Sequence, residues 1–338
     1  KICSCHHSSQ EDQNMLATVS HITKLFASYA HASTGLEKIV ICNTKGLLSI
    51  LTNLCIISTT NNKHDRYPKH HSDGSDVTQP LSIIISDICA DALLVISELS
   101  REILTLHTIL HRPHLLETII LLSQTDSNSR VRENASNAIF HFVNAPPKSI
   151  SPTEKKYLIK TLHSSLDDVC SAVRRYAGAS LFQMAYNNES NDVTLMLTHE
   201  DGTLLSTLVV LLQNDPNSKS RANAVWILFY CACSEKKSNV ELLGDQNGLL
   251  DALAGAICDD TCAEVRTAAA KALRKISETI NPNMKSHEAL LSSLLKASAR
   301  WNDIGHDYYE EESGNSMESY DDSIGFGCFL SESSKQKQ

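Results

Sequence analysis

The feature of this sequence that most restricts its fold is a spacing that recurs four times along the chain. In each copy an aspartate stands six residues before an arginine, and successive arginines are separated by 42, 47 and 45 residues. An alanine follows each arginine by three residues, and a large aliphatic residue follows that alanine by four. The four pairs are Asp126 and Arg132, Asp168 and Arg174, Asp215 and Arg221, and Asp260 and Arg266. A period of this length predicts an array of similar stacked units.

Each unit is predicted to contain two antiparallel helices. Ahead of the aspartate, apolar residues recur at helical spacing, as in residues 204–212. Polar residues and proline then interrupt this pattern, and a second helix begins near the arginine. Gly46, Gly202 and Gly248 each stand just ahead of a leucine pair, where the chain turns into the first helix. Because neither helix can bury its apolar face alone, we expect the units to stack into a right-handed α-solenoid.

The array is predicted to extend beyond the four clear copies. Ser86, Cys89 and Leu93 stand 46 residues earlier and keep the small and aliphatic pattern, without the aspartate and arginine. Helical apolar spacing also covers residues 15–30, 46–57 and 288–299. A polar stretch at about 59–80 interrupts the degenerate unit and is expected to form a surface loop. The prediction is an all-α domain over residues 1–301 with about six or seven units.

The composition agrees with a helical chain that has a buried core. With 12 Gly and 8 Pro in 338 residues, the chain has few of the residues that a turn-rich β protein needs. A hydrophobic content of 42% is too high for a disordered chain. The longest apolar run, residues 224–233, is shorter than the roughly 18 residues of a membrane span. We therefore expect no membrane partner.

The acidic charge is concentrated at the C-terminal end. Residues 302–338 contain nine acids and two lysines, a net of −7, which leaves −2 of the total of −9 for the other 301 residues. This segment lacks helical periodicity and is predicted to be an acidic, largely disordered tail. It could serve solubility, or Glu310, Glu311 and Glu312 could occupy a basic part of the array as a pseudo-ligand. The overall negative charge disfavours a nucleic-acid partner.

The cysteines indicate a reducing compartment. They number eleven, an odd count, and most lie in apolar segments with helical spacing, which is typical of buried thiols rather than of a disulfide framework. Disulfide-rich domains form in oxidising compartments. The expected location is therefore intracellular, either cytoplasmic or nuclear.

Four segments that contain the repeated arginines resemble armadillo or HEAT repeats. They are residues 131–139, 173–177, 220–228 and 265–273. The recurring aspartate and arginine resemble the inter-repeat polar ladder of HEAT arrays, whereas the glycine before a leucine pair and Trp226 resemble armadillo units. The resemblance covers residues 81–280 well and the first 80 weakly, and it does not separate the two subfamilies. It implies that the aspartate–arginine pairs are structural.

The resemblance also implies a concave groove that is lined by the last helix of each unit and holds an extended peptide or a partner helix. Nuclear-import adaptors of the armadillo family place Trp and, four residues later, Asn along this groove. The corresponding pairs here are Asp91 and Val95, Asn137 and His141, Ala179 and Gln183, Trp226 and Tyr230, and Lys271 and Lys275. Only Trp226 matches, which disfavours a receptor for nuclear-localisation signals.

The groove positions nevertheless have a definite chemistry, because residues four apart share one face of a helix. Trp226 and Tyr230 form an aromatic platform of the kind that dominates binding energy. Three further residues, Asn137, His141 and Gln183, can hydrogen-bond a peptide backbone. The last pair, Lys271 and Lys275, favours an acidic ligand. The alternative for Trp226 and Tyr230 is a role in the core, where aromatic side chains are common.

No catalytic apparatus is visible in the sequence. Phosphate-binding glycine loops, nucleophile elbows and zinc-protease motifs are absent. His107 and His111 could share a metal ion, but no glutamate lies between them and Pro113 follows. The expectation is a scaffold or adaptor without enzymatic activity, cofactor or metal, which binds a protein or peptide partner. A HEAT-like nucleic-acid handler, or a metal-dependent enzyme that uses the histidine-rich segments, is the alternative.

Overall fold

The computed structural model describes residues 10–44, 46–61, 81–112, 114–144, 150–187, 190–234 and 236–279. Every regular element in these ranges is a helix, which confirms the all-α prediction. The predicted helix at 288–299 and the predicted acidic tail at 302–338 lie outside the described residues, as do residues 62–80 of the expected loop. The start of that loop was predicted too early, because helix α3 continues to Asn61.

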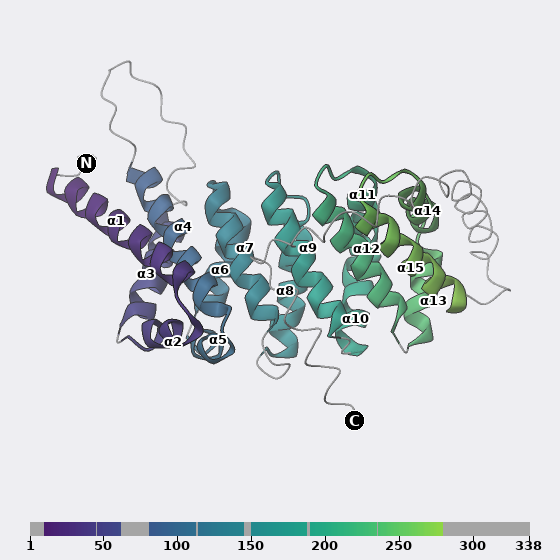
Figure 1. Ribbon diagram of the computed structural model, residues 1–338, viewed down its shortest axis with the longest axis horizontal. Coiled ribbons are helices and arrows are strands. Elements are labelled where there is room, and N and C mark those ends of the chain that lie inside the picture. Colours follow the sequence, from purple (N-terminus) through teal and green to yellow (C-terminus); the bar gives the residue numbers. More distant parts are fainter. Residues whose placement is uncertain are drawn as a thin grey trace, which may run out of the picture.

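The helices form three rows that run along the array (Figure 1). The row of long helices contains α1 (Gln10–Ala32), α4 (Leu81–Ser100), α7 (Ser129–Val143), α9 (Ser171–Tyr186), α12 (Ser218–Ala232) and α15 (Ala263–Thr279). The middle row contains α3 (Leu47–Asn61), α6 (Leu115–Thr125), α8 (Pro152–Ser165), α11 (Thr203–Asn214) and α14 (Leu249–Asp259). The short row contains α2 (Gly35–Asn43), α5 (Ile103–Leu110), α10 (Ser190–Leu197) and α13 (Lys237–Asp245).

Within the described residues, α1 is followed by five units, each with a middle and a long helix. A third, short helix precedes this pair in four of the units, which the prediction of two-helix units missed. These helices have only eight or nine residues, about two turns, so the sequence shows too little of their period to reveal them. The unit formed by α8 and α9 has two helices, as predicted.

The repeated alanines and aliphatic residues lie in the core. Ala135, Ala177, Ala224 and Ala269 are at most 1% exposed, and the aliphatic residues four positions later are equally buried. Each long helix packs against the next one in its row. The small alanine side chain permits this close approach, and the aliphatic side chain one turn later fills the space between helices.

A left-handed residue precedes the middle helix in four units. Gly46, Gly202 and Gly248 have φ values of 85°, 86° and 77°, which fits their predicted role as turn residues. The fourth unit has His114 at this position, with φ of 61°. A side chain is strained in this conformation, whereas glycine adopts it freely.

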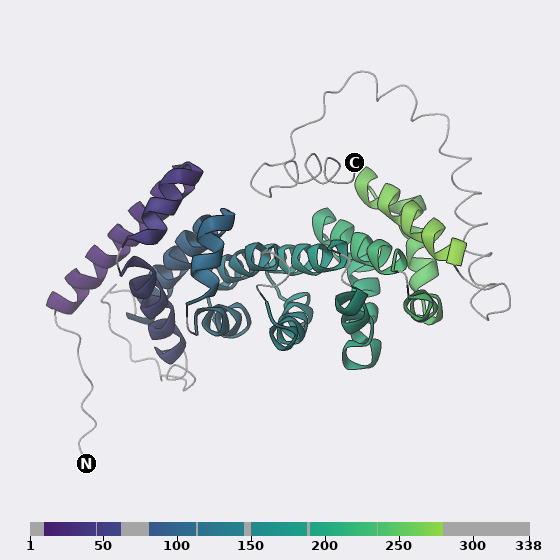
Figure 2. The same ribbon diagram turned by 90° about the horizontal axis from the view of Figure 1, so that it is seen from below.

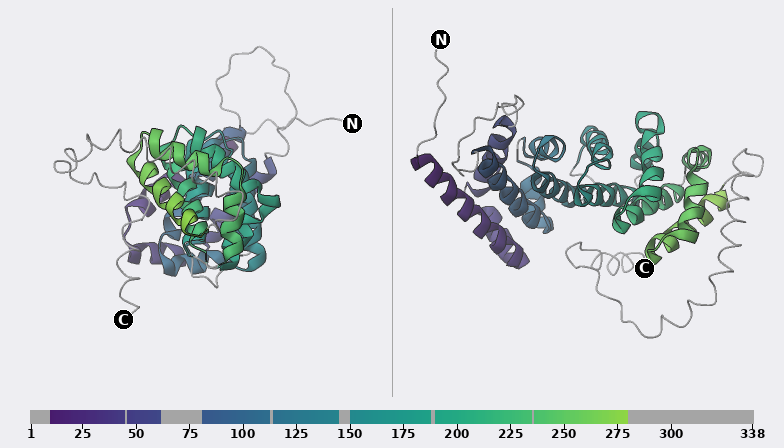
Figure 3. Two further views of the ribbon diagram at one scale, coloured as in Figure 1. Left: turned by 90° about the vertical axis from the view of Figure 1, so that its right-hand side faces the viewer. Right: turned by 90° about the horizontal axis from the view of Figure 1, so that it is seen from above.

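The array is a bent rod. Figures 2 and 3 show the long helices on the inner side of the bend and the middle helices on its outer side. At the two ends of the array, α1 and α15 tilt toward the inner side of the bend. The concave face of this α-solenoid is therefore lined by α4, α7, α9, α12 and α15.

Candidate functional site

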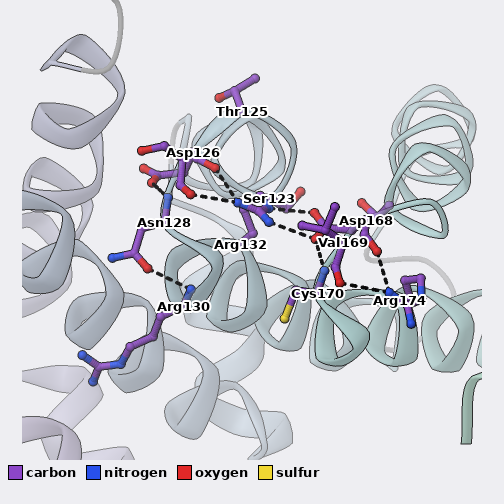
Figure 4. Close-up of polar contacts among 12 residues, drawn as sticks. Ser123, Thr125, Asp126, Asn128, Arg130, Arg132, Asp168, Val169, Cys170 and Arg174 are labelled. Atoms are coloured by element: carbon purple, nitrogen blue, oxygen red, sulfur yellow. Dashed lines mark hydrogen bonds and ion pairs between the residues drawn. The ribbon is translucent and has the colours of Figure 1, made fainter. Parts of the chain in front are cut away.

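Three of the four repeated arginines form a ladder that joins successive units, and Figure 4 shows two of them, Arg132 and Arg174. The Nε atoms of Arg132, Arg174 and Arg221 lie 2.7, 2.6 and 2.7 Å from a carboxylate oxygen of the aspartate in the next unit. Their Nη2 atoms donate to the second oxygen of the same carboxylate, at 2.9, 3.1 and 2.8 Å. These two-point contacts are charge-assisted and fix the orientation of both groups. The carboxylates belong to Asp168, Asp215 and Asp260.

Each arginine also contacts the aspartate of its own unit, through the backbone. The Nη1 atoms of Arg132, Arg174, Arg221 and Arg266 donate to the carbonyl oxygen six residues earlier, at 2.9, 2.7, 2.8 and 2.7 Å. The constant spacing of six residues thus brings the guanidinium back over the turn between the two helices. The predicted structural role of the eight ladder residues is consistent with this geometry.

The aspartate carboxylates shape the same turns. Oxygen Oδ1 of Asp126, Asp168, Asp215 and Asp260 accepts a hydrogen bond from the backbone N–H two residues later, at 2.9, 2.7, 2.8 and 2.8 Å. Such local bonds favour a turn over a continued helix. Asp126, Asp215 and Asp260 are the C-caps of their middle helices, whereas Asp168 lies two residues after the C-cap of α8. Each aspartate also binds the preceding unit with the same side chain.

The ladder shifts the acid–base equilibria of its members. Burial alone would raise the pKa of Asp168 and of Asp260, but the arginine and the backbone N–H that bond each carboxylate outweigh burial and lower its pKa. The hydrogen bond to aspartate raises the pKa of Arg132, Arg174 and Arg221. Asp168, Asp260 and these three arginines are therefore charged at neutral pH.

A serine continues the ladder at its N-terminal end. Ser86 occupies the position of the arginine in the degenerate unit, and its hydroxyl donates to Oδ1 of Asp126 at 3.4 Å. Both side chains belong to buried residues. The contact is consistent with the predicted degenerate copy, with a neutral hydrogen bond in place of an ion pair.

The residues predicted to line the groove come from four long helices of the concave row. Lys271 is exposed, and five others are partly exposed: Asn137, Gln183, Trp226, Tyr230 and Lys275. His141 differs, because only 8% of it is exposed. Burial, followed by the nearby charge of Arg101, lowers its pKa to about 4, so the ring is neutral at pH 7. Little of His141 is available to a bound peptide, contrary to the expectation.

Trp226 and Tyr230 belong to an aromatic cluster that spans α9 and α12. The ring of Tyr230 lies 5.1 Å from Tyr186 and 5.6 Å from Phe182, measured between centroids. It also lies 6.2 Å from Trp226 and 5.0 Å from Phe229. These rings pack on the core, yet Trp226, Phe229, Tyr230 and Tyr186 keep part of their surface exposed. The core role and the surface role that the sequence left open are thus combined in the same side chains.

The last long helix adds charge to this cluster. Nζ of Lys271 on α15 lies 5.3 Å from the ring centroid of Trp226, within range of a cation–π interaction. The indole N–H of Trp226 donates to Glu264 at 3.4 Å. Nζ of Lys275 lies 3.6 Å from Glu278 on the same helix. Aromatic and cationic groups therefore meet at the C-terminal part of the concave face.

The N-terminal part of the concave face contains polar contacts that the sequence did not predict. Asp91 on α4 pairs with Arg130 on α7, and the guanidinium of Arg175 lies 4.7 Å above the ring of Tyr176. The amide of Asn134 donates to the carbonyl oxygen of Ala90 at 2.7 Å. The position of Asn134, two residues after a ladder arginine, is the one signal that could have revealed this second contact between units.

The histidines considered as metal ligands contact each other and their own helices. The rings of His107 and His111 lie 4.1 Å apart, and Nδ1 of His111 bonds the carbonyl oxygen of His107. His114 instead pairs with Glu117. Among the described residues, no three His, Cys, Asp or Glu side chains are grouped so that they could hold a metal ion.

The helices were also compared with the length and apolar character that a membrane span requires. In the ranges described above, no single helix has both the length and the apolar character of a membrane span. Helix α2 and residues 47–57 of α3 reach these limits only when taken together, across a bend of 76°.

Comparisons with known proteins agree with this architecture. The family model of the HEAT repeat matches residues 249–280, which contain α14 and α15. No curated protein sequence matches the chain. A designed armadillo repeat protein has a TM-score of 0.58 and 17% identity over 80% of this chain and 96% of its own. A structure of computationally designed armadillo repeat proteins for modular peptide recognition has a TM-score of 0.57 and 20% identity, over 79% of this chain and 94% of its own.

A third solved structure contains a bound peptide. It is a designed armadillo repeat protein in complex with the peptide (KR)4, with a TM-score of 0.55 and 18% identity over 80% of this chain and 95% of its own. At these identities the likeness concerns the fold. It confirms an α-solenoid of the armadillo and HEAT type.

Proposed function

We propose that this armadillo/HEAT-type helical repeat protein is a non-enzymatic scaffold or adaptor that binds a partner peptide or helix on its concave face. The aromatic and cationic patch formed by Trp226, Tyr230, Lys271 and Lys275 is the observation that carries the proposal. Trp and Tyr provide most of the binding energy in many interfaces, because they bury a large area with few rotatable bonds. The designed relatives that bind peptides support the kind of partner.

The patch favours a ligand with two kinds of side chain. An apolar or aromatic side chain of the peptide packs on Trp226 and Tyr230, and an acidic side chain close to it pairs with Lys271 or Lys275. Farther along the face, the amides of Asn137 and Gln183 bond the backbone of an extended peptide. Nucleic acid is a weaker candidate, because the chain has a net charge of −9.

The proposed location is the cytoplasm or the nucleus. All eight cysteines that the structure describes are free thiols. Five of them lie on helices α2, α3, α4, α12 and α14, one on each, where they pack within the array. This pattern supports a reducing compartment.

The test uses peptides selected from a random library by display against the full 338-residue chain. The dissociation constant of a selected acidic peptide is then measured by fluorescence anisotropy for the native chain and for the Trp226→Ala/Tyr230→Ala variant. Loss of one such anchor costs about 2 kcal/mol, so we expect the variant to bind at least about 30-fold more weakly.

The control is Tyr157→Ala, which removes a 48% exposed tyrosine from α8, on the outer side of the bend. We expect this variant to bind like the native chain. Equal affinity in the double variant, with a native circular-dichroism spectrum, would show that the concave patch is not the binding site.

A further inference from the structure

Exposed apolar side chains concentrate at the N-terminal end of the array. Ten of the large hydrophobic residues described as exposed lie on α1, α2 and α3, and only seven lie on the rest of the described chain. Single exposed hydrophobic residues are common on protein surfaces, but a contiguous group marks an interaction surface. This end of the molecule therefore differs from the other faces.

Four of these residues form one stripe along α1. Thr23, Ala27 and Ala30 are buried and form a narrow seam, through which α1 packs on α4. A turn of about 100° per residue places the stripe residues together, roughly 90° around the helix from that seam. They are Met15, Ile22, Phe26 and Tyr29, with exposed fractions of 61%, 46%, 38% and 52%.

The polar side of α1 faces the other way and holds the helix in place. Nδ1 of His31 lies 3.2 Å from a carboxylate oxygen of Glu98, which is buried on α4. Lys38, just beyond α1, reaches the other oxygen at 3.5 Å. The stripe is thus presented by a helix whose position is already fixed, so its association costs little ordering entropy.

The plan of the array shows what would cover the stripe. In the later units, each long helix packs against an antiparallel middle helix, as α4 does with α3, α7 with α6 and α15 with α14. Among the described residues, α1 has no helix of this kind beside it. At the same end, α3 exposes Ile50 and Ile57, which share one side of that helix because they are seven residues apart. A helix antiparallel to α1, with an apolar face, would fit this position.

The stripe itself matches such a helix. Met15 and Tyr29 each stand seven residues from Ile22, so the pattern is symmetric about Ile22. A second α1 placed antiparallel would set Ile22 against the partner's Ile22, and Met15 against the partner's Tyr29. Phe26 would face the partner's Thr18, a residue whose hydroxyl already donates to the carbonyl oxygen of Asn14. No buried donor would be left without an acceptor by that contact.

We propose that the protein forms a twofold-symmetric dimer through antiparallel pairing of α1. A self-complementary face of this kind is the basis of an isologous interface, the commonest type in soluble oligomers. The concave faces of the two copies remain open, because the stripe lies on the side of α1 away from His31 and Glu98. The dimer would present two copies of the binding surface, which raises the avidity for a partner with two binding segments.

Sedimentation velocity of the full chain over a range of concentrations tests this proposal. We expect a concentration-dependent dimer that Ile22→Glu disrupts by at least about 100-fold in dissociation constant, because two unpaired carboxylates would be buried at the twofold axis. Leu104→Glu is the matched control, since Leu104 on α5 is 70% exposed and lies outside the stripe. That variant should dimerise like the native chain. If Ile22→Glu does not fold, Ile22→Ser replaces it.

A charge exchange tests the antiparallel register. Met15→Glu and Tyr29→Lys should each weaken the dimer, whereas the double variant should recover it, because each introduced carboxylate then faces an introduced ammonium group twice per dimer. A native chain that stays monomeric up to its solubility limit would overturn the proposal. So would a dimer that Ile22→Glu leaves intact, or single variants that weaken the dimer without recovery in the double variant.

Discussion

Removing one aspartate–arginine pair of the ladder should weaken the contact between the two units that it joins. Arg174 bonds both carboxylate oxygens of Asp215 and the carbonyl oxygens of Asp168 and Val169. Only 13% of the Arg174 side chain and 1% of the Asp215 side chain are exposed. Arg174→Met keeps much of the apolar volume and removes all four contacts.

The cost follows from what remains at the site. Removal of one partner from a buried ion pair costs about 3–5 kcal/mol, because the other charge is left unpaired. The backbone N–H of Asn217 still donates to Asp215 at 2.8 Å, which offsets part of this loss. We therefore expect Arg174→Met to lower the free energy of unfolding by about 3 kcal/mol. Arg174→Lys should cost less, because it keeps the charge but loses the two-point contact.

A double-mutant cycle isolates the pair. Asp215→Asn removes the charge and keeps an oxygen for the Asn217 N–H, so the Arg174→Met/Asp215→Asn variant should lose about 1–3 kcal/mol less than the sum of the single variants. Urea unfolding followed by circular dichroism at 222 nm measures each value. The stability of a repeat array depends on contacts between neighbouring units, so the Arg174→Met transition should also become broader.

A cost below about 1 kcal/mol for Arg174→Met, or strictly additive single variants, would refute this reasoning. Either result would mean that the ion pair is no stronger than an exposed surface pair. The ladder would then mark the repeats in the sequence without stabilising their stacking.

Two histidines give further predictions. His141 has a pKa of about 4 in the folded chain and an ordinary pKa of 6.5, so the unfolded chain gains its proton first and stability falls as pH drops from about 6.5 to 4. His141→Phe should remove up to about 3 kcal/mol of this acid destabilisation, measured by urea unfolding at several pH values; an unchanged pH profile would contradict it. His114→Gly should raise the thermal midpoint, because it relieves about 1 kcal/mol of left-handed strain, whereas the exposed pair with Glu117 contributes little; a lower midpoint would contradict it.

The repeat pattern could be predicted from the sequence because each unit carries the same physical requirements. The turn needs Asp126 and its equivalents, the stacking needs a small residue such as Ala135, and the core needs an aliphatic residue one turn later. The degenerate unit was found from spacing alone, and Ser86 proved to occupy the place of the missing arginine.

The partners within the ladder could not be predicted in the same way. The spacing of six residues relates Asp168 to Arg174 along the chain, but Arg174 uses the backbone of Asp168 and the carboxylate of Asp215, 41 residues later. Contacts between distant residues depend on how units stack, which a local spacing does not specify. The same reason explains why Tyr186 and Phe182 were not predicted as part of the aromatic cluster. They join it only because α9 packs beside α12, which brings their rings to Tyr230.

Two further features depend on the environment of a residue rather than on its type. His114 takes the left-handed position that glycine occupies in three other units, and no histidine signal predicts this. His141 was expected on the groove because it follows Asn137 by four residues. It is buried instead, beside Phe140, with ring centroids 5.3 Å apart. Periodicity predicts the direction in which a side chain points, but how closely the neighbouring helices and side chains cover it decides how much of it is exposed.

A crystal structure of the full chain with a display-selected peptide tests the central claim most directly. The account predicts that the peptide lies on the concave face, across α9, α12 and α15, in contact with Trp226 and Tyr230 and with an acidic side chain near Lys271. A peptide bound on the outer side of the bend, against α8, α11 or α14, would contradict it.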